Sequence, residues 1–220
     1  MIIQNLYQFE HDYWSKKLFI CGIDEVGRGC LAGPVVTSAA ILHANSFHPL
    51  LIDSKKLSSQ NLLKVYDWLQ INCTYSIAIA DNNLIDQYNI YKTTQMIMKQ
   101  AALNLLTKTK INPSLILIDA MPLTLQSTPF DQITIKSFTQ GESKSASIAA
   151  ASIIAKVTRD KIVTRMAQNF ANYGLQNHKG YGTILHKKNL IKFKPSIIHR
   201  ESFLKKFLAD NNHEQQSIFC

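Results

Sequence analysis

Residues 22–29 read Gly-Ile-Asp-Glu-Val-Gly-Arg-Gly, so two adjacent carboxylates and a glycine-flanked arginine directly follow an apolar run. We expect residues 18–23 to form a strand that enters the core. Asp24 and Glu25 would then lie at its carboxyl end, where open α/β sheets usually bind ligands. Their hard oxygen atoms suit Mg²⁺ or Mn²⁺, and the guanidinium of Arg28 suits a phosphate. The stretch therefore suggests metal-assisted chemistry on a phosphate.

The strand geometry leaves an alternative open. Successive side chains of a regular strand point to opposite faces, so both carboxylates can serve one site only if the strand ends or distorts there. Gly27 and Gly29 would permit such a distortion and a close approach of the backbone to a substrate. An isolated Asp-Glu pair is more often a solvated surface turn, so this interpretation depends on the rest of the chain.

Length and charge restrict the class of protein. The chain has 220 residues and 46% hydrophobic content, enough for one compact unit. We expect a sheet domain over residues 1–170 and a basic helical segment over residues 171–220 of the same unit. Lysine and arginine outnumber aspartate and glutamate by 24 to 15, a formal charge of +9. Because several segments carry this charge, it favours a nucleic-acid groove, although a basic chain can also lack such a partner.

The cysteines and the apolar segments predict a soluble, cytoplasmic protein. The four cysteines, Cys21, Cys30, Cys73 and Cys220, form no CxxC pair and have no zinc-ligand spacing, which is typical of free thiols in a reducing compartment. Residues 1–17 lack the basic start and apolar core of a secretory signal. The longest apolar stretch, residues 146–155, is too short to span a bilayer. We expect no membrane contact.

Hydrophobic periodicity predicts alternating strands and helices, and hence an α/β layered domain. The expected strands cover residues 18–25, 34–42, 74–80, 115–118 and 132–136. The expected helices cover residues 59–72, 90–107 and 145–165, the first capped by Ser58 or Ser59. Beyond residue 172 the polarity rises, and short helices such as residues 204–209 are expected in place of strands.

Two further acids join the first pair by the same reasoning. Asp119 directly follows the apolar run Leu-Ile-Leu-Ile at residues 115–118, so it should also lie at the carboxyl edge of a buried strand. Glu142 precedes a long, nearly uniformly apolar helix that should pack tightly on the sheet. Both have ordinary explanations: Asp119 as the start of a turn, and Glu142 as an electrostatic partner of the helix amino terminus.

Six motifs occur in the order typical of one family: GIDEVGRG with LAGPVV at residues 22–36, DSKKL at 53–57, LILIDA at 115–120, SIAAASIIAKVTRD at 147–160, HKGYGT at 178–183 and HRESF at 199–203. Together they resemble the bacterial ribonuclease HII family, the type 2 ribonucleases H. The resemblance implies an RNase H-like fold with a mixed central sheet, flanking helices and a carboxyl-terminal helical segment.

The resemblance also implies an activity. It is metal-dependent endonucleolytic cleavage of the RNA strand of RNA-DNA hybrids, and of duplex DNA on the 5′ side of an embedded ribonucleotide, leaving 5′-phosphate and 3′-hydroxyl ends. Such enzymes act in ribonucleotide excision repair and DNA replication. Carried over by motif, Asp24, Glu25, Asp119 and Glu142 would be the catalytic carboxylates, which bind two Mg²⁺ or Mn²⁺ ions about 4 Å apart.

The same resemblance implies a set of substrate-binding residues. Gly27, Arg28 and Gly29 would contact the ribose 2′-hydroxyl through the backbone, which distinguishes RNA from DNA. Tyr181 would stack on the deoxyribose at an RNA-to-DNA junction, although taken alone it is an ordinary loop aromatic. The expected phosphate contacts are Lys55, Lys56, Lys144 and Arg159, each of which is by itself more often a solvated charge.

The chain departs from the family pattern at two places. The family usually has Lys-Gly-Asp where residues 140–142 read Gln-Gly-Glu, so the fourth acid is longer by one methylene. Since catalytic geometry is sensitive to displacements of about 1 Å, a slower enzyme or a changed preference between Mg²⁺ and Mn²⁺ is expected. Cys30 stands where proline is commoner, and we expect this change to be tolerated.

The remaining features are weaker. We assign His178, His186 and His199 to packing or phosphate contact rather than to metal binding. Residues 215–219 faintly resemble the peptides that bind bacterial sliding clamps, so a weak clamp contact is a hypothesis; otherwise we expect a monomer. Two other functions stay open: a different two-metal nuclease acting on DNA junctions, and a non-catalytic module that binds duplexes.

Overall fold

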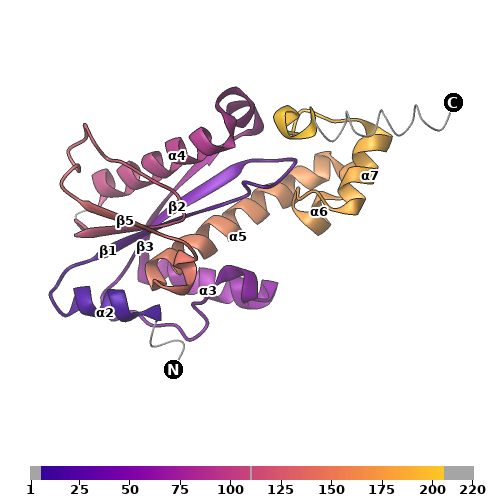
Figure 1. Ribbon diagram of the computed structural model, residues 1–220. Helices are drawn as coiled ribbons and strands as arrows, with labels where there is room; N and C mark the ends of the chain where they lie inside the picture. The colour runs from indigo at the N-terminus through magenta and orange to yellow at the C-terminus, as the bar shows by residue number, and fades with distance from the viewer. Residues whose placement is uncertain (1–5, 110, 206–220) are drawn as a thin grey trace.

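A computed structural model describes residues 6–109 and 111–205 of the chain. Its centre is one sheet of five strands, each close to a predicted strand (Figure 1). These are β1 (Ile20–Val26), β2 (Val35–Leu42), β3 (Cys73–Ala80), β4 (Leu115–Asp119) and β5 (Thr134–Phe138). Their order across the sheet is β3-β2-β1-β4-β5.

The sheet is mixed, as expected for an RNase H-like fold. β1, β2 and β3 form an antiparallel meander, in which Gly22 pairs with Ala40. β1, β4 and β5 run parallel, with Ile20 opposite Leu115. Because β1 and β4 are parallel neighbours, their carboxyl ends meet at the same edge of the sheet, and the acids that follow their apolar runs are brought together.

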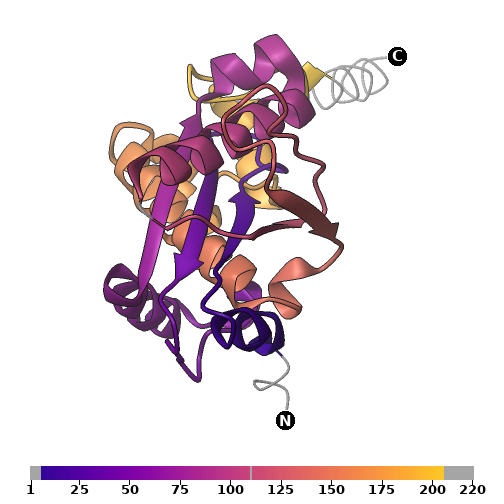
Figure 2. The same ribbon diagram turned by 90° about the vertical axis from the view of Figure 1, so that its left-hand side faces the viewer.

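Helices cover both faces of the sheet, so that the molecule has three layers (Figures 1 and 2). One face packs against α4 (Asn82–Lys108), whose apolar side chains join those of β1, β2 and β4 in the largest cluster of buried residues. The other face packs against α3 (Ser59–Asn72) and α5 (Ala146–Asn169). The predicted helix over residues 59–72 is confirmed, with Ser58 as its cap.

α5 lies unusually close to the sheet, and Gly22 is the reason. A Cβ atom at Gly22 would lie 2.1 Å from the backbone carbon of Ser147, so only glycine allows this approach. Ser145 caps the helix by accepting a hydrogen bond from the amide of Ile148, and most of its first ten residues are buried. The tight packing fixes the start of α5 against β1.

α4 begins earlier than predicted because it contains a sharp bend. Asn89, with φ 62°, interrupts the helical backbone, and its side chain accepts from the amide of Lys92, which caps the second part. The periodic pattern identified only this second part, from residue 90. The first part has its own cap, Asp81, which accepts from the amide of Leu84.

The two ends of the described chain lie at opposite ends of α5 (Figure 1). Near its start lies α2 (Gln8–Trp14), for which the sequence analysis predicted no element; the buried Glu10 of α2 accepts hydrogen bonds from Ser145 and Ser147. Beyond α5 come the short elements η3 (Ala171–Tyr173) and α6 (Leu175–His178), and then α7 (Ile184–Phe193). Residues 201–205 are helical, while the rest of the predicted helix at 204–209 lies outside the described residues.

Three of the four cysteines lie within the described residues. Cys21, Cys30 and Cys73 are buried free thiols, as predicted. Among residues 6–109 and 111–205, no helix is long and apolar enough to cross a membrane.

Candidate active site

Three of the four predicted carboxylates meet at the carboxyl edge of the sheet. Asp24 and Glu25 leave β1, Asp119 is the last residue of β4, and all three line one cavity of about 570 Å³. Lys55 and Ser152 also line the cavity. Tyr181, from the carboxyl-terminal segment, forms part of the same wall. The expected grouping of the first acids is therefore present.

The expected distortion of the first strand is not present. β1 continues through Val26, with Asp24 opposite Ser38 and Glu25 opposite Thr37 of β2. Side chains of a regular strand alternate, so the two carboxylates leave β1 on opposite sides. They still reach one cavity because the other neighbour, β4, ends at Asp119, which leaves this end of β1 open on that side.

Glu142 reaches the site from the 3₁₀ turn η2 (Gly141–Ser143), and its carboxylate is buried. Its Oε1 accepts from Lys55 Nζ at 2.8 Å, and its Oε2 accepts from Ser152 Oγ at 3.0 Å. The preceding residue ties the turn to β4, because the amide of Gly141 donates to Asp119 Oδ1 at 2.9 Å. Glu142 is thus bonded to two residues that line the cavity, Lys55 and Ser152, and its turn is bonded to Asp119.

The electrostatics of the group reflect buried like charges. Burial, followed by the neighbouring charge of Glu25, raises the pKa of Asp24 well above its usual range. Burial raises the pKa of Glu25 to about 7, although Arg28, whose Nη1 lies 3.2 Å from Glu25 Oε1, opposes the rise. A cation placed among these groups would relieve both the repulsion and the loss of solvation.

The donor set has the chemistry that a divalent cation requires, namely four carboxylates with hard oxygen atoms. One of these atoms, Glu25 Oε2, is buried and has no hydrogen-bond partner in the described part of the chain. Within the described residues, however, no three His, Cys, Asp or Glu side chains already converge as metal ligands. Internal donors hold them apart: Arg28 on Glu25, Lys55 on Glu142 and Gly141 on Asp119. Metal binding would exchange some of these hydrogen bonds for metal-oxygen bonds.

The Gly27-Arg28-Gly29 turn is supported from behind by a buried arginine. Arg200 donates to the carbonyl oxygens of Gly27 at 2.7 Å, Arg28 at 2.8 Å and Gly33 at 2.9 Å. Gly27 has φ 95°, a conformation that favours glycine. The turn leads into Cys30, which forms an isolated antiparallel bridge with Tyr181. The two elements expected to recognise the sugar are therefore adjacent.

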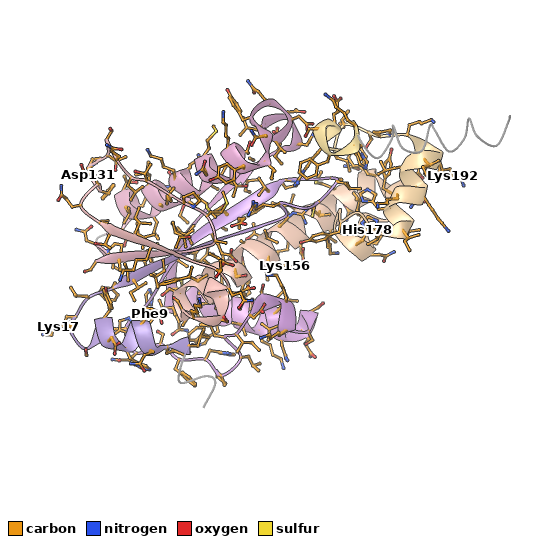
Figure 3. All side chains as sticks on the ribbon, viewed as in Figure 1. Phe9, Lys17, Asp131, Lys156, His178 and Lys192 are labelled. Atoms are coloured by element: carbon orange, nitrogen blue, oxygen red, sulfur yellow. The ribbon has the colours of Figure 1, made fainter. Side chains whose placement is uncertain are left out.

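The four predicted phosphate contacts, Lys55, Lys56, Lys144 and Arg159, lie in different surroundings. Lys55 lines the cavity, whereas Lys56 is an exposed side chain 3.9 Å from Asp53 and Lys144 lies over the ring of Phe138 at 5.5 Å, both outside the cavity wall. Two lysines that were not singled out, Lys156 and Lys179, line the cavity instead; Lys156 projects from α5 (Figure 3).

The prediction for Arg159 is wrong in its geometry. Its side chain is fully buried, and it donates to the carbonyl oxygens of Pro34 at 2.8 Å, Lys179 at 2.9 Å and Ala32 at 3.2 Å. From the sequence alone, an arginine on this helix is expected to face solvent. In the structure, backbone carbonyl oxygens of residues distant in sequence accept its hydrogen bonds instead. Arg159 is structural and not placed to contact a phosphate.

Ser152 and its neighbour Ser54 are site residues that the sequence analysis did not find. Ser54 Oγ lies 2.9 Å from Ser152 Oγ, which in turn donates to Glu142. The only local signal is a serine among apolar residues on a buried helix, where a hydroxyl needs a partner. Its partner comes from a different segment, so sequence spacing alone could not identify it.

Several solved structures of ribonucleases H have the same fold. The chain is similar to the ribonuclease H2 from Pyrococcus horikoshii OT3 (TM-score 0.70, 23% identity, 84% of this chain and 93% of that one). It is also similar to the RNase HII in a PCNA:RNase HII complex from Archaeoglobus fulgidus (0.65, 23%, 84% and 94%) and to Bst-RNase HIII in complex with Mn²⁺ (0.65, 21%, 85% and 64%). At these identities the likeness establishes the RNase H-like fold.

Sequence comparison identifies the family. A family model described as Ribonuclease HII matches residues 21–206. The chain is 42% identical over 202 residues to the ribonuclease HII of Ligilactobacillus salivarius (strain UCC118), covering 91% of this chain and 75% of that protein. It is 39% identical over 209 residues to that of Alkaliphilus metalliredigens (strain QYMF), covering 93% and 99%. The chain therefore belongs to the ribonuclease HII family and is a nuclease.

Proposed function

We propose that this nuclease hydrolyses the RNA strand of RNA-DNA hybrids and incises duplex DNA on the 5′ side of an embedded ribonucleotide. One observation carries the proposal: a single cavity is lined by Asp24, Glu25 and Asp119 and also by Tyr181, whose backbone pairs with the segment that follows the Gly27-Arg28-Gly29 turn. The groups that would cut a phosphodiester and those that would examine its sugar thus share one site.

Asp24, Glu25, Asp119 and Glu142 would hold two divalent cations, Mg²⁺ or Mn²⁺. Such ions supply an activated water and stabilise the leaving 3′-oxygen, so that the products carry 5′-phosphate and 3′-hydroxyl ends. Neighbouring donors would orient two of the carboxylates: Ser152 orients Glu142, and the amide of Gly141 orients Asp119. The solved Mn²⁺ complex of Bst-RNase HIII, which shares the fold, supports the choice of ion.

Selection of RNA requires a contact with the 2′-hydroxyl, the group that DNA lacks. The backbone of the Gly27-Arg28-Gly29 turn is our candidate for this contact, since Arg200 binds the carbonyls of Gly27 and Arg28 while Gly29 is exposed. Tyr181 is 40% exposed beside this turn, and its ring can stack on the next sugar. Stacking on a deoxyribose there, as the family resemblance implies, would select an RNA-to-DNA junction.

Positive charge along the cavity would bind the backbone phosphates. Lys55, Lys156 and Lys179 line it, which agrees with the formal charge of +9 on the chain. Lys156 also pairs with Asp160 at 2.9 Å, which orients its ammonium group.

Cleavage of an end-labelled DNA duplex that carries one ribonucleotide tests the proposal. It is measured in Mg²⁺ and in Mn²⁺, beside an all-DNA duplex and an Asp119→Asn variant. We expect metal-dependent incision on the 5′ side of the ribonucleotide that both controls lack. Cleavage of an all-DNA junction would support the rival junction nuclease, and tight binding without incision would support the binding module.

A sliding clamp is the one protein partner that we propose. The Archaeoglobus structure contains an RNase HII with PCNA, and the clamp-like residues 215–219 of this chain lie outside the described residues. Titration of a peptide of residues 210–220 against a bacterial sliding clamp tests the contact. We expect micromolar binding, and no affinity at high micromolar concentration would remove the proposal.

A further inference from the structure

Three buried histidines are hydrogen-bonded, directly or through one another, to the backbone of residues 180 and 181. The proposed chemistry uses none of them. His178, His186 and His199 are 8%, 0% and 2% exposed. The rings of His178 and His186 stack at 4.4 Å, and Tyr173 meets the ring of His199 edge-on at 4.6 Å. Figure 3 places His178 among the carboxyl-terminal helices, at the end of α5 away from α2. The expected packing role is confirmed, but their hydrogen bonds are directional.

The donors and acceptors around these rings fix their tautomers. The carbonyl oxygen of Tyr181 can only accept, so His186 Nδ1, at 2.9 Å, carries a proton and His186 Nε2 is an acceptor. The amide of Ser196 can only donate, so His199 Nδ1, at 3.0 Å, is an acceptor, and the carbonyl of Ser196 is farther away at 3.3 Å. His199 Nε2 must then carry a proton.

The two rings meet in the only consistent way. His199 Nε2 and His186 Nε2 are 3.2 Å apart, a pair that needs one donor and one acceptor. The tautomers above supply them, with His199 donating to His186. A directed chain of hydrogen bonds therefore runs from the amide of Ser196 through His199 and His186 to the carbonyl of Tyr181. His178 adds a second hold on the same turn, because its Nδ1 accepts from the amide of Gly180 at 3.2 Å.

The chain joins two segments that flank the sugar-recognising turn. Residues 30–33 pair on one side with Tyr181 and Gly180, through the Cys30 bridge and the amide of Leu31. On the other side they pair with residues 198–200, through the bridge of Ala32 with His199. The contact between His186 and His199 connects the two outer segments behind residues 30–33. The backbone of Tyr181 is thereby fixed relative to the Gly27-Arg28-Gly29 turn.

We propose that His186 and His199 are positioning residues that hold the backbone of Tyr181 in register with the Gly27-Arg28-Gly29 turn, and so set the preference for an RNA-to-DNA junction. This inference rests on the proposed function, because it assigns the recognition of the junction to Tyr181. The histidines do not touch the substrate; they act through the carbonyl of Tyr181.

The surroundings favour neutral rings, as the chain requires. Burial lowers the pKa of His199 to about 4 and also lowers the pKa of His186. Among the described residues, the titratable side chains whose rings contact the pair are His178 and Tyr173, with Tyr181 at the end of the chain, and none of them carries a carboxylate.

Substrate preference tests the proposal in three variants: His186→Phe, His199→Gln and Tyr181→Ala. The measurement is the ratio of kcat/KM for a duplex with one ribonucleotide to kcat/KM for a continuous RNA-DNA hybrid, which offers no deoxyribose beside the cut. We expect the ratio to fall about tenfold in each variant, and no further in the double variant His186→Phe with Tyr181→Ala. An equal loss on both substrates would reduce the histidines to a structural role and overturn the proposal.

A matched control and a second measurement separate the possible failures. His43→Gln, at the opposite end of β2, should leave the ratio unchanged. The ¹⁵N chemical shifts of the imidazoles in the wild-type protein report the tautomers without any activity: at pH 7 we expect a proton on Nδ1 of His186 and on Nε2 of His199. Other tautomers would overturn the chain even if the enzyme is active. Absence of junction incision by the wild type, with these tautomers present, would count against the proposed function alone.

Discussion

The ammonium group of Lys55 lies 2.8 Å from Oε1 of Glu142, although the lysine side chain is 79% exposed and the carboxylate side chain only 7%. An exposed cation thus neutralises a buried acid at the wall of the cavity. The hydrogen bond to Glu142 raises the pKa of Lys55, so the lysine stays charged at neutral pH. A metal ion and Lys55 therefore compete for the same carboxylate.

Lys55→Met should strengthen metal binding and weaken substrate binding. Removal of the competing charge is expected to tighten Mn²⁺ binding about threefold to tenfold in calorimetric titration, since the carboxylates lose a cationic neighbour. The same change should raise KM and reduce the salt dependence of duplex binding by about one unit of slope. Lys56→Met is the matched control, because Lys56 pairs with Asp53 outside the cavity. Equal effects of both variants would contradict the prediction.

Ser152→Ala should lower turnover about tenfold with little change in KM. The variant removes the donor at 3.0 Å from Glu142 Oε2, and a hydrogen bond to a charged group contributes about 1.5–3 kcal/mol. Ser147→Ala is the control on the same helix, since the Ser147 hydroxyl is buried without a partner among the described residues. Steady-state kinetics of the two variants provide the comparison, and unchanged turnover in Ser152→Ala would remove the assigned role.

Glu142→Asp should change the relative activity in Mg²⁺ and Mn²⁺. The shorter side chain cannot keep both the Lys55 and the Ser152 contacts without moving the turn η2, so the position of the fourth carboxylate changes. Turnover of wild type and variant is measured in each metal. Identical metal profiles would show that the extra methylene of Glu142 has no catalytic consequence.

Arg200→Lys should destabilise the fold by about 2–4 kcal/mol, because lysine cannot serve the carbonyls of Gly27, Arg28 and Gly33 together. Urea unfolding measures the loss. Arg165→Lys, an exposed substitution on α5, should change the free energy of unfolding by less than about 0.5 kcal/mol. A stability of Arg200→Lys equal to that of the control would show that the buried guanidinium is dispensable.

His199 should make the protein less stable as the pH falls below about 6.5. Its pKa is lowered from 6.5 to about 4 in the fold, so the folded state binds fewer protons, and its contribution is complete above pH 6.5 and lost towards pH 4. Asp24 and Glu25, whose pKa values are raised, act in the opposite direction. The difference in unfolding free energy between wild type and His199→Gln isolates the histidine and should shrink as the pH falls over this range. A difference that does not change with pH would show that the pKa of His199 is not lowered in the folded state.

Local patterns were sufficient for the strands and for three of the acids. An apolar run that ends in an acid predicted both β1 with Asp24 and Glu25 and β4 with Asp119, because a buried strand must leave its first polar group at an edge of the sheet. The same patterns failed at α4, where the bend at Asn89 interrupts the period, and at α2, which is short and mostly polar at its surface.

The partners of buried polar groups depend on the tertiary structure. Whether Arg159 faces a phosphate or three carbonyls, whether Ser152 meets Glu142, and which tautomer His186 adopts all depend on atoms from distant segments. The amino-acid order determines which residues are apolar and where strands and helices begin, since these are short-range properties. Hydrogen-bond satisfaction in a core is a long-range property, because each donor takes whichever acceptor the packing of the sheet and helices brings within reach.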